Sequence, residues 1–251
     1  MIWVVFCPTI MVAQSDFGSS LSGEVEKKLD KKLTVGMQLE LRMRDNSTEV
    51  DRLSAGLNAD YKCLPWLKAS AGVSFLGDNV RRISHYDEND RDVLKGKAMV
   101  GDRKNLREYW GARLRGDLSL TATRQFGHFR FSLRERWQYT YRFRRYVEGR
   151  YNYVYKKSDI AYRIYPAKGK NELRSRLMVS YRNSALALEP YLGAEIFNTR
   201  EIEKVRYTIG FSYKIHKGRT IDVFYRYQDM TDESDDHPDV HLIGVAYKMK
   251  F

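Results

Sequence analysis

The chain has 251 residues, of which 43% are hydrophobic and 30% charged, so it can build one sizeable domain. Lys and Arg outnumber Asp and Glu by 44 to 32, giving a formal net charge of +12, and mean hydropathy is −0.58. No apolar run reaches the roughly 18 residues that a membrane-spanning helix needs, which excludes transmembrane helices.

The first residues, MIWVVFCPTIMVA, form a short apolar segment that does not alternate like the rest of the chain. It is typical of the apolar core of an export signal, with a plausible cleavage point between Ala13 and Gln14, although the usual preceding basic segment is missing. The alternative is a buried first strand. We expect residues 1–13 to be an export segment, truncated or misassigned at its start, and residues 14–251 to be the mature domain. Cys7 lies in the export segment, so only Cys63 remains, which excludes a disulfide framework or a cysteine-based metal site.

The rest of the sequence alternates apolar and polar residues with a period of two, the pattern of a strand with one apolar face. In LTVGMQLELRMR, residues 33–44, Leu39 and Leu41 share one face while Glu40 and Arg42 share the other. The pattern recurs at 21–29, 53–61, 67–75, 110–122, 129–142, 173–181, 186–196, 205–215, 221–227 and 243–251. These segments predict about eleven strands. In 129–142 one residue, Glu135, breaks the apolar face.

Several of these strands have ten or more residues, longer than is usual in soluble sheets. Charged residues occupy one face, and aromatic residues gather toward the strand ends, as in the aromatic girdles of membrane barrels. The residues expected in the girdles are Tyr61, Phe129, Tyr181, Tyr213 and Phe251 at one rim and Phe75, Trp110, Tyr139, Tyr141, Tyr207 and Tyr225 toward the other. The sequence therefore predicts an all-β fold, a single antiparallel up-and-down transmembrane β-barrel of about ten to twelve strands, rather than a soluble β-sandwich.

Short and long connections alternate along the chain. The long ones are residues 45–51, 77–108, 143–171, 198–203 and 229–239. Outer-membrane barrels carry short turns on the periplasmic side and long loops outside. With an odd number of strands, the first and last strands run in the same direction across the wall. Either one strand is missing from the count or residues 14–18 return through the lumen.

The last strand, Ile243 to Phe251, alternates and ends in an aromatic residue. This ending resembles the assembly signal read by the outer-membrane barrel-insertion machinery. The segments SDFGSSLSGEVEKKLDKKLTVGMQLELRMRDN, FRFSLRERWQYTYR, ELRSRLMVSYR and VRYTIGFSYKIHKGRTIDVFYRYQ, together with the last strand, resemble an uncharacterised outer-membrane β-barrel family, a domain of unknown function of Gram-negative bacteria. The resemblance implies the fold and the outer membrane, with lipid and lipopolysaccharide around the barrel, and supplies no activity.

Charged residues on the inward face define the candidate site. They are Arg113, Arg115, Arg130, Arg134, Arg136, Arg174, Arg176, Glu40, Glu189 and Glu195. Two interpretations remain open: a porin-like conduit with an anion-attracting wall, or a lumen filled by paired side chains. Arginine at every second position lines a lumen rather than a soluble binding surface, so the net charge does not indicate nucleic acid.

Enzymatic alternatives rest on few residues. Asp90 and Asp92 in one long loop, with Asp239 and His241 before the last strand, resemble the catalytic groups of the omptin proteases, where carboxylates and an Asp–His pair activate water. A lipid hydrolase using Ser19 and His241 on the lipid face is a second hypothesis.

Two loops suggest binding. Asp232, Asp235 and Asp236 form an acidic segment that is a weak candidate for a divalent cation, against a merely solvated loop. Residues 143–171 interleave tyrosines with Arg and Lys, which suits glycan or lipid head-group contact, although a hairpin extending the barrel explains the same pattern. We expect no cofactor.

Overall fold

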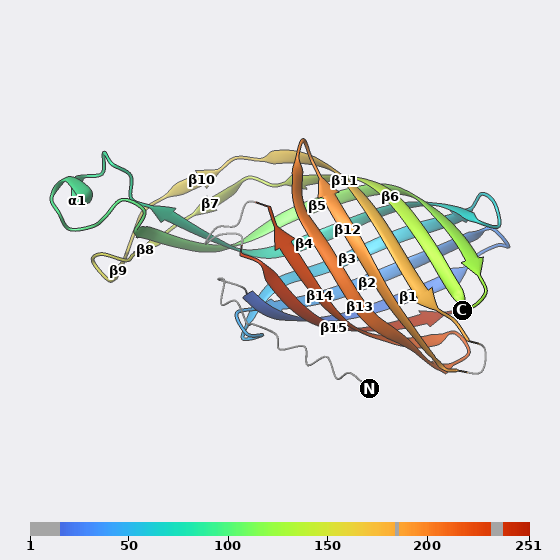
Figure 1. Cartoon of the computed structure of the whole chain (residues 1–251). Coiled ribbons are helices and arrows are strands. Elements are labelled where there is room, and N and C mark those ends of the chain that lie inside the picture. The colour runs from blue at the N-terminus through green and yellow to red at the C-terminus, as the bar shows by residue number, and fades with distance from the viewer. Residues whose placement is uncertain (1–15, 184–185, 232–237) are drawn as a thin grey trace, which may run out of the picture.

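The computed structural model describes residues 16–183, 186–231 and 238–251 (Figure 1). The expected export segment, residues 1–13, lies outside this range. The barrel strands are β1 Asp16–Lys28, β2 Leu33–Arg44, β3 Glu49–Lys62, β4 Leu67–His85, β5 Arg103–Phe126, β6 Phe129–Arg142, β11 Lys168–Tyr181, β12 Leu188–Asn198, β13 Ile202–His216, β14 Arg219–Met230 and β15 Val240–Lys250. The other elements are one helical turn, α1 Arg91–Leu94, and the short strands β7 Arg145–Val147, β8 Arg150–Asn152, β9 Lys157–Asp159 and β10 Arg163–Tyr165.

Eleven of the described strands close into a barrel, which confirms the fold predicted from the sequence. Neighbours pair antiparallel except at one seam, where β1 and β15 run parallel, from Asp16 beside Val240 to Glu26 beside Lys250. The seam settles the question of strand parity. Residues 16–28 form a wall strand rather than returning through the lumen, and both terminal strands run in the same direction.

The barrel has two unlike rims. One carries the tight turns, where Gly127 and Gly218 adopt φ values of 56° and 76° that other residues adopt only with strain. The C-terminal residue Phe251 also lies at this rim, where its N–H bonds to the carbonyl of Glu26 at 2.9 Å. We call this the short-turn rim and the opposite one the arm rim.

The two longest loops expected from the sequence are largely ordered as an arm. The β3–β4 ladder ends at Arg52 beside Asp78, but the β4–β5 ladder continues to His85 beside Arg103. We define the arm as residues 79–109 and 143–167. It projects from the barrel and ends near α1 (Figure 1). The β8–β9 hairpin extends β5 at Leu106, so the tyrosine-rich segment forms a hairpin extension, and Tyr109 stacks on Tyr165 at 4.8 Å between ring centroids.

Polarity across the barrel wall is inverted relative to a water-soluble protein. The buried side chains include the carboxylates of Asp78, Glu189, Glu195 and Asp222, whereas leucines such as Leu21 and Leu57 are about 60% exposed on the outer face. Soluble proteins bury apolar residues and leave charged ones outside. The alternation therefore sends the polar face into the lumen and the apolar face outward.

Candidate functional site: the arginine-rich lumen

The lumen is a cavity of about 2070 Å³ lined by the inward faces of the barrel strands. Its lining includes Trp66 and Lys250 at the short-turn rim and Arg44 and Arg200 at the arm rim. The space between the side chains thus extends from one rim to the other. The described side chains therefore leave an open space in the lumen rather than filling it.

The lining of the cavity is strongly basic. It contains 24 Arg and Lys residues against 15 Asp and Glu residues among those the structure describes. All ten lumen positions expected from the sequence belong to it: Arg113, Arg115, Arg130, Arg134, Arg136, Arg174, Arg176, Glu40, Glu189 and Glu195. The structure therefore brings these side chains around one space with an excess of positive charge.

The charge is distributed unevenly around the ring of strands. We call the inward face of β5, β6 and β11, with Arg182 directly after β11, the arginine wall; its arginines are Arg113, Arg115, Arg130, Arg134, Arg136, Arg142, Arg174, Arg176 and Arg182, and Lys168 and Lys170 on β11 also line the cavity. We call the inward face of β1–β4 the small wall; its short side chains are Ser20, Ser22, Thr34, Ser54, Gly56, Asn58, Ser70, Gly72 and Ser74. Long side chains on one wall and short ones on the other leave the open space between them.

A buried carboxylate organises the middle of the lumen. Glu195 is 5% exposed, and its oxygens lie 2.9 Å from Arg134 Nη2, 3.0 Å from Arg174 Nη2 and 3.4 Å from Arg206 Nη1. Hydrogen bonds between charged groups are the strong ones, and three guanidinium groups on one carboxylate fix one another's positions. The Glu195 cluster leaves a net positive charge in the lumen.

The ring of Phe197, 2% exposed, lies beside the Glu195 cluster. Arg174, Lys204 and Arg206 place their charged groups 4.3, 4.7 and 4.5 Å from its centroid. Cations at these distances are attracted by the face of an aromatic ring. An inward phenylalanine thus helps to hold cations that a single carboxylate cannot neutralise.

Several lumen cations form no close ion pair with a described carboxylate. No described carboxylate forms an ion pair within 4.0 Å with Arg115, Arg130, Arg176, Lys204 or Arg226, all of which line the cavity. Arg115 instead donates to Thr140 Oγ1 at 3.4 Å, and Arg226 stacks on Phe224 at 4.6 Å. These groups supply charge that solvent or anions must balance.

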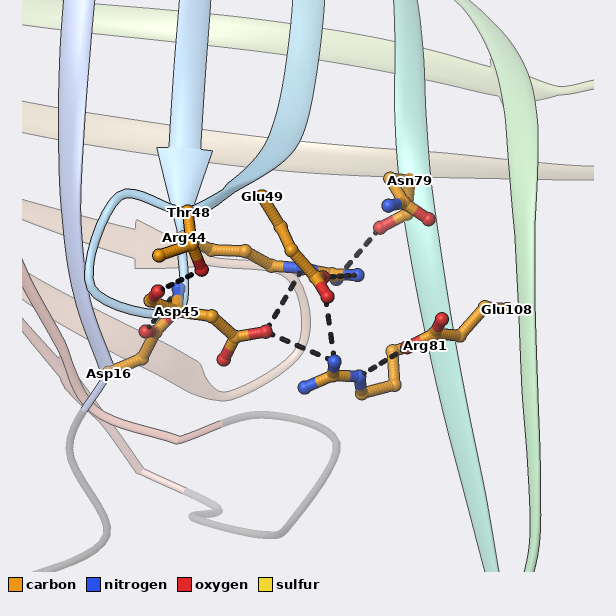
Figure 2. Close-up of polar contacts among 8 residues, drawn as sticks. All are labelled: Asp16, Arg44, Asp45, Thr48, Glu49, Asn79, Arg81 and Glu108. Carbon is orange, nitrogen blue, oxygen red and sulfur yellow. Dashed lines mark hydrogen bonds and ion pairs between the residues drawn. The ribbon is translucent and has the colours of Figure 1, made fainter. Parts of the chain in front are cut away.

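The arm rim is braced by a polar network (Figure 2). Arg81 on the arm lies 3.0 Å from Asp45 in the β2–β3 turn and donates to Glu108 on β5 at 2.7 Å. Asp16 at the start of β1 accepts a hydrogen bond from the N–H of Asp45 at 2.9 Å. Asp45 has a φ of 50°, in the left-handed region that few residues other than glycine adopt. The network ties the first strand, the turn and the arm together at the mouth.

Comparison with known proteins identifies a family for this barrel. The profile of the family described as "Protein of unknown function (DUF2490)" matches residues 19–237. The chain belongs to the DUF2490 family. No curated protein matches the sequence significantly.

Solved structures similar to this DUF2490 chain are β-barrels. The beta domain of the Bordetella autotransporter BrkA is similar with a TM-score of 0.52 and 14% identity, covering 87% of this chain and 82% of the other. The "CymD monoaromatic hydrocarbon channel" gives a TM-score of 0.42 and 10% identity over 85% and 81% of the chains. The first similarity supports the barrel fold and nothing about activity. Among the described residues, no helix is long and apolar enough to cross a membrane.

The structure does not bring the four omptin-like candidates of this DUF2490 chain together. Asp90 and Asp92 lie by α1 at the tip of the arm, where Asp90 pairs with Lys104 and Asp92 accepts from Tyr155 Oη at 2.8 Å. Asp239 and His241 lie at the start of β15, where Asp239 accepts from Tyr227 and His241 Nδ1 lies 2.6 Å from Tyr225 Oη. The arm continues past Asp78 to His85, and α1 lies at its tip, away from the barrel strand β15 (Figure 1).

The second enzymatic hypothesis places Ser19 near His241, and the seam does make their strands neighbours. His241 faces Phe17 across the parallel ladder, and Ser19 faces Ile243. His241 bonds to Tyr225, and Ser19 makes no described hydrogen bond to it. The acidic cation candidates Asp232, Asp235 and Asp236 lie outside the described residues. Within those residues, no group of three or more His, Cys, Asp or Glu side chains is arranged to hold a metal ion.

Sequence reasoning missed the cluster around Glu195 and the network around Arg81. The period of two shows that Glu195 and Phe197 point inward, but it does not show which residues on other strands they meet. Register places Glu195 between Arg176 and Arg206 on the neighbouring strands. Arg134 comes from the next strand beyond.

Proposed function

We propose that this DUF2490 protein is an outer-membrane barrel that conducts small anions through its arginine-rich lumen. The observation that carries the proposal is the rim-to-rim cavity whose lining has an excess of Arg and Lys over Asp and Glu. A channel wall of one charge sign, bounded by a low-dielectric barrel, raises the local concentration of ions of the opposite sign.

The inverted polarity of the wall supports the membrane location. A belt of exposed leucines, valines and isoleucines would face lipid, and the exposed aromatic residues toward the rims would lie at the two interfaces. A closed barrel satisfies backbone hydrogen bonds within the hydrocarbon region. The expected export segment, residues 1–13, supports passage to the outer membrane, where lipid, lipopolysaccharide and the insertion machinery would be the partners.

The unequal walls suggest how an anion would pass. Arg115 and Arg176 form no ion pair within 4.0 Å with a described carboxylate, so their guanidinium groups would be available to a transient anion. The small wall leaves room for the ion's water. Conduction requires binding strong enough to admit the ion and weak enough to release it. A lumen with many separate cations, and no single site that surrounds the anion tightly, would bind an anion and still release it.

The test uses the full chain refolded in detergent. Migration on a gel before and after boiling establishes a closed barrel, and planar-bilayer recordings under a KCl gradient establish conduction. We expect discrete steps and a reversal potential of the sign that chloride preference gives. A folded barrel without conductance would contradict the proposal. A stable monomer in buffer without detergent would contradict the membrane location itself.

A further inference from the structure

One acidic side chain stands on the otherwise apolar outer face of the barrel. Glu135 points outward from β6 and is exposed, between Leu133 and Trp137, which are 49% and 47% exposed. It is the seventh residue of the strand Phe129–Arg142 and therefore lies near mid-height of the wall. If the barrel spans a membrane, this carboxyl group faces the hydrocarbon centre.

Glu135 has one polar neighbour on the outer face. Ser175 on β11 is its register partner and donates a hydrogen bond from Oγ to Glu135 Oε2 at 2.6 Å. Exposed apolar residues surround the pair: Leu118, Leu120, Leu133, Trp137, Leu173 and Leu177. The outer face thus holds a small polar centre within a large apolar patch.

No other position on the described wall is comparable. The remaining outward ionisable residues of the barrel strands lie toward the ends: Lys27, Arg124 and Arg219 near the short-turn rim, and Asp229 and His241 near the arm rim. Rim groups reach water or head groups, whereas a central carboxyl does not. Ionisable groups within the membrane are costly and usually have a protein partner.

A single serine does not satisfy this carboxyl group. A carboxylate offers about four acceptor positions, and Ser175 fills one of them. The serine hydroxyl itself can accept a further bond. A carboxyl group in hydrocarbon is least costly in its neutral form, which carries one O–H donor. In that form the pair presents the Glu135 O–H as a donor and the lone pairs of Ser175 Oγ as an acceptor, and it is complementary to a second copy of itself.

We propose that this face of β6 and β11 is the interface of a homodimer, with Ser175 of each copy hydrogen-bonded to Glu135 of the other. The proposal rests on the membrane location proposed above. Two copies inserted in the same orientation are related by a two-fold axis along the membrane normal, which brings residues of equal depth together. Such an interface is isologous, the commonest form of oligomer contact. No charge has to be supplied by a different protein, and the surrounding leucines would pack against their symmetry mates.

The first test measures association of the full chain in detergent and in vesicles at increasing lipid dilution. Wild type is expected to sediment as a dimer. Glu135→Leu, which removes both intermolecular hydrogen bonds, is expected to raise the dissociation constant at least about ten-fold. Glu135→Gln keeps an acceptor oxygen and supplies an N–H donor, and it is expected to retain the dimer. Ser175→Ala is expected to weaken it in the direction of Glu135→Leu.

The second test locates the interface by cross-linking. In a background lacking Cys7 and Cys63, Ser175→Cys is expected to form a disulfide between copies under oxidation. Leu21→Cys is the matched control. Leu21 is 60% exposed on β1, which lies five strands from both β6 and β11 around the barrel. It is expected to stay uncross-linked.

The outcomes separate the two proposals. Each variant is first checked for heat-modifiable migration and conductance, which report the membrane barrel alone. A folded, conducting monomer overturns the dimer and leaves the function standing. A dimer that survives Glu135→Leu and cross-links through Leu21→Cys overturns the assigned face, and a monomer that binds lipid in a Glu135-dependent way reassigns the pair to lipid. Loss of the barrel in wild type overturns the membrane location instead.

Discussion

The arginine wall and the small wall divide the requirements of a channel between them. The arginine wall supplies charge, but guanidinium side chains on every strand would fill a barrel of this size. The small wall supplies space through Ser54, Gly56 and Ser74, and its charges are mixed, with Glu24, Glu26, Glu40 and Asp60 beside Arg42, Arg44 and Arg52. Most of the short side chains and the densest group of arginines therefore lie on different strands. Space and positive charge can be altered largely independently.

The largest expected effect comes from the carboxylate that holds the arginine wall in place. Glu195→Gln leaves Arg134, Arg174 and Arg206 without their shared partner. Breaking a buried ion pair costs about 3–5 kcal/mol, and because the lumen is wet we expect about 2–3 kcal/mol of lost unfolding free energy. Denaturant unfolding of the refolded barrel measures it. Glu203→Gln is the control, because that carboxylate pairs with Lys170 near the arm rim and is more exposed. Equal losses in the two variants would contradict the central role of Glu195.

Filling the small wall should reduce conductance. Ser54→Trp places an indole in the lumen, and we expect single-channel conductance to fall at least about two-fold because the open cross-section narrows. Leu53→Trp, at the adjacent outward position, is the matched control and should leave conductance unchanged. Equal conductance in the two variants would contradict the idea that the small wall keeps the lumen open.

Neutralising one wall at a time should move ion selectivity in opposite directions. Arg115→Gln with Arg176→Gln should lower the anion-to-cation permeability ratio by about two-fold, whereas Glu24→Gln on the small wall should raise it. Reversal potentials at low salt measure both changes. At 1 M salt the screening length is only about 3 Å, so both shifts should shrink. A shift of the same sign in both variants would contradict a field across the lumen.

The smallest expected effect lies outside the barrel, at the tip of the arm. A hydrogen bond from Lys104, and another from the N–H of Asp87, hold the pKa of Asp90 below its ordinary value of 3.8. A carboxyl group with a lowered pKa stabilises the folded form above pH 3.8, and this is lost as pH falls through the lowered pKa. The protection factors of amides in residues 87–102, which are corrected for the intrinsic slowing of exchange in acid, should therefore fall at acid pH while those of the barrel strands stay high. Asp90→Asn should show lower protection factors in this segment already at neutral pH and lose their pH dependence.

The sequence predicts which way each wall residue points, because alternation depends only on the residue's own strand. For that reason the ten lumen positions all line the cavity. It does not predict cross-strand register, so the meeting of Glu195 with Arg134, 61 residues away, was not foreseen. The ordered arm was missed for a different reason. Both faces of a strand outside the barrel contact water or short loop segments, so Val80 to His85 lack the alternation that marks a wall strand. The sequence shows that Glu135 interrupts the apolar face of its strand. It does not show that Ser175 is the hydrogen-bond partner, because that depends on the register between β6 and β11.

The parallel seam has a consequence for how the chain folds. Every other junction of the barrel joins two barrel strands that follow one another along the chain. The seam instead joins the first and last strands, and Lys250 bonds to Glu26 across 224 residues. Closing a loop of that length costs about 5 kcal/mol of chain entropy, the largest such cost in the fold. Chain entropy therefore opposes this closure more than any other in the barrel, and a sheet that has not yet closed the seam has two open edges. An unfinished sheet of this kind invites pairing with other chains. Pairing of β15 with β1 thus removes both open edges, and with them the tendency of the unfinished sheet to pair with other chains.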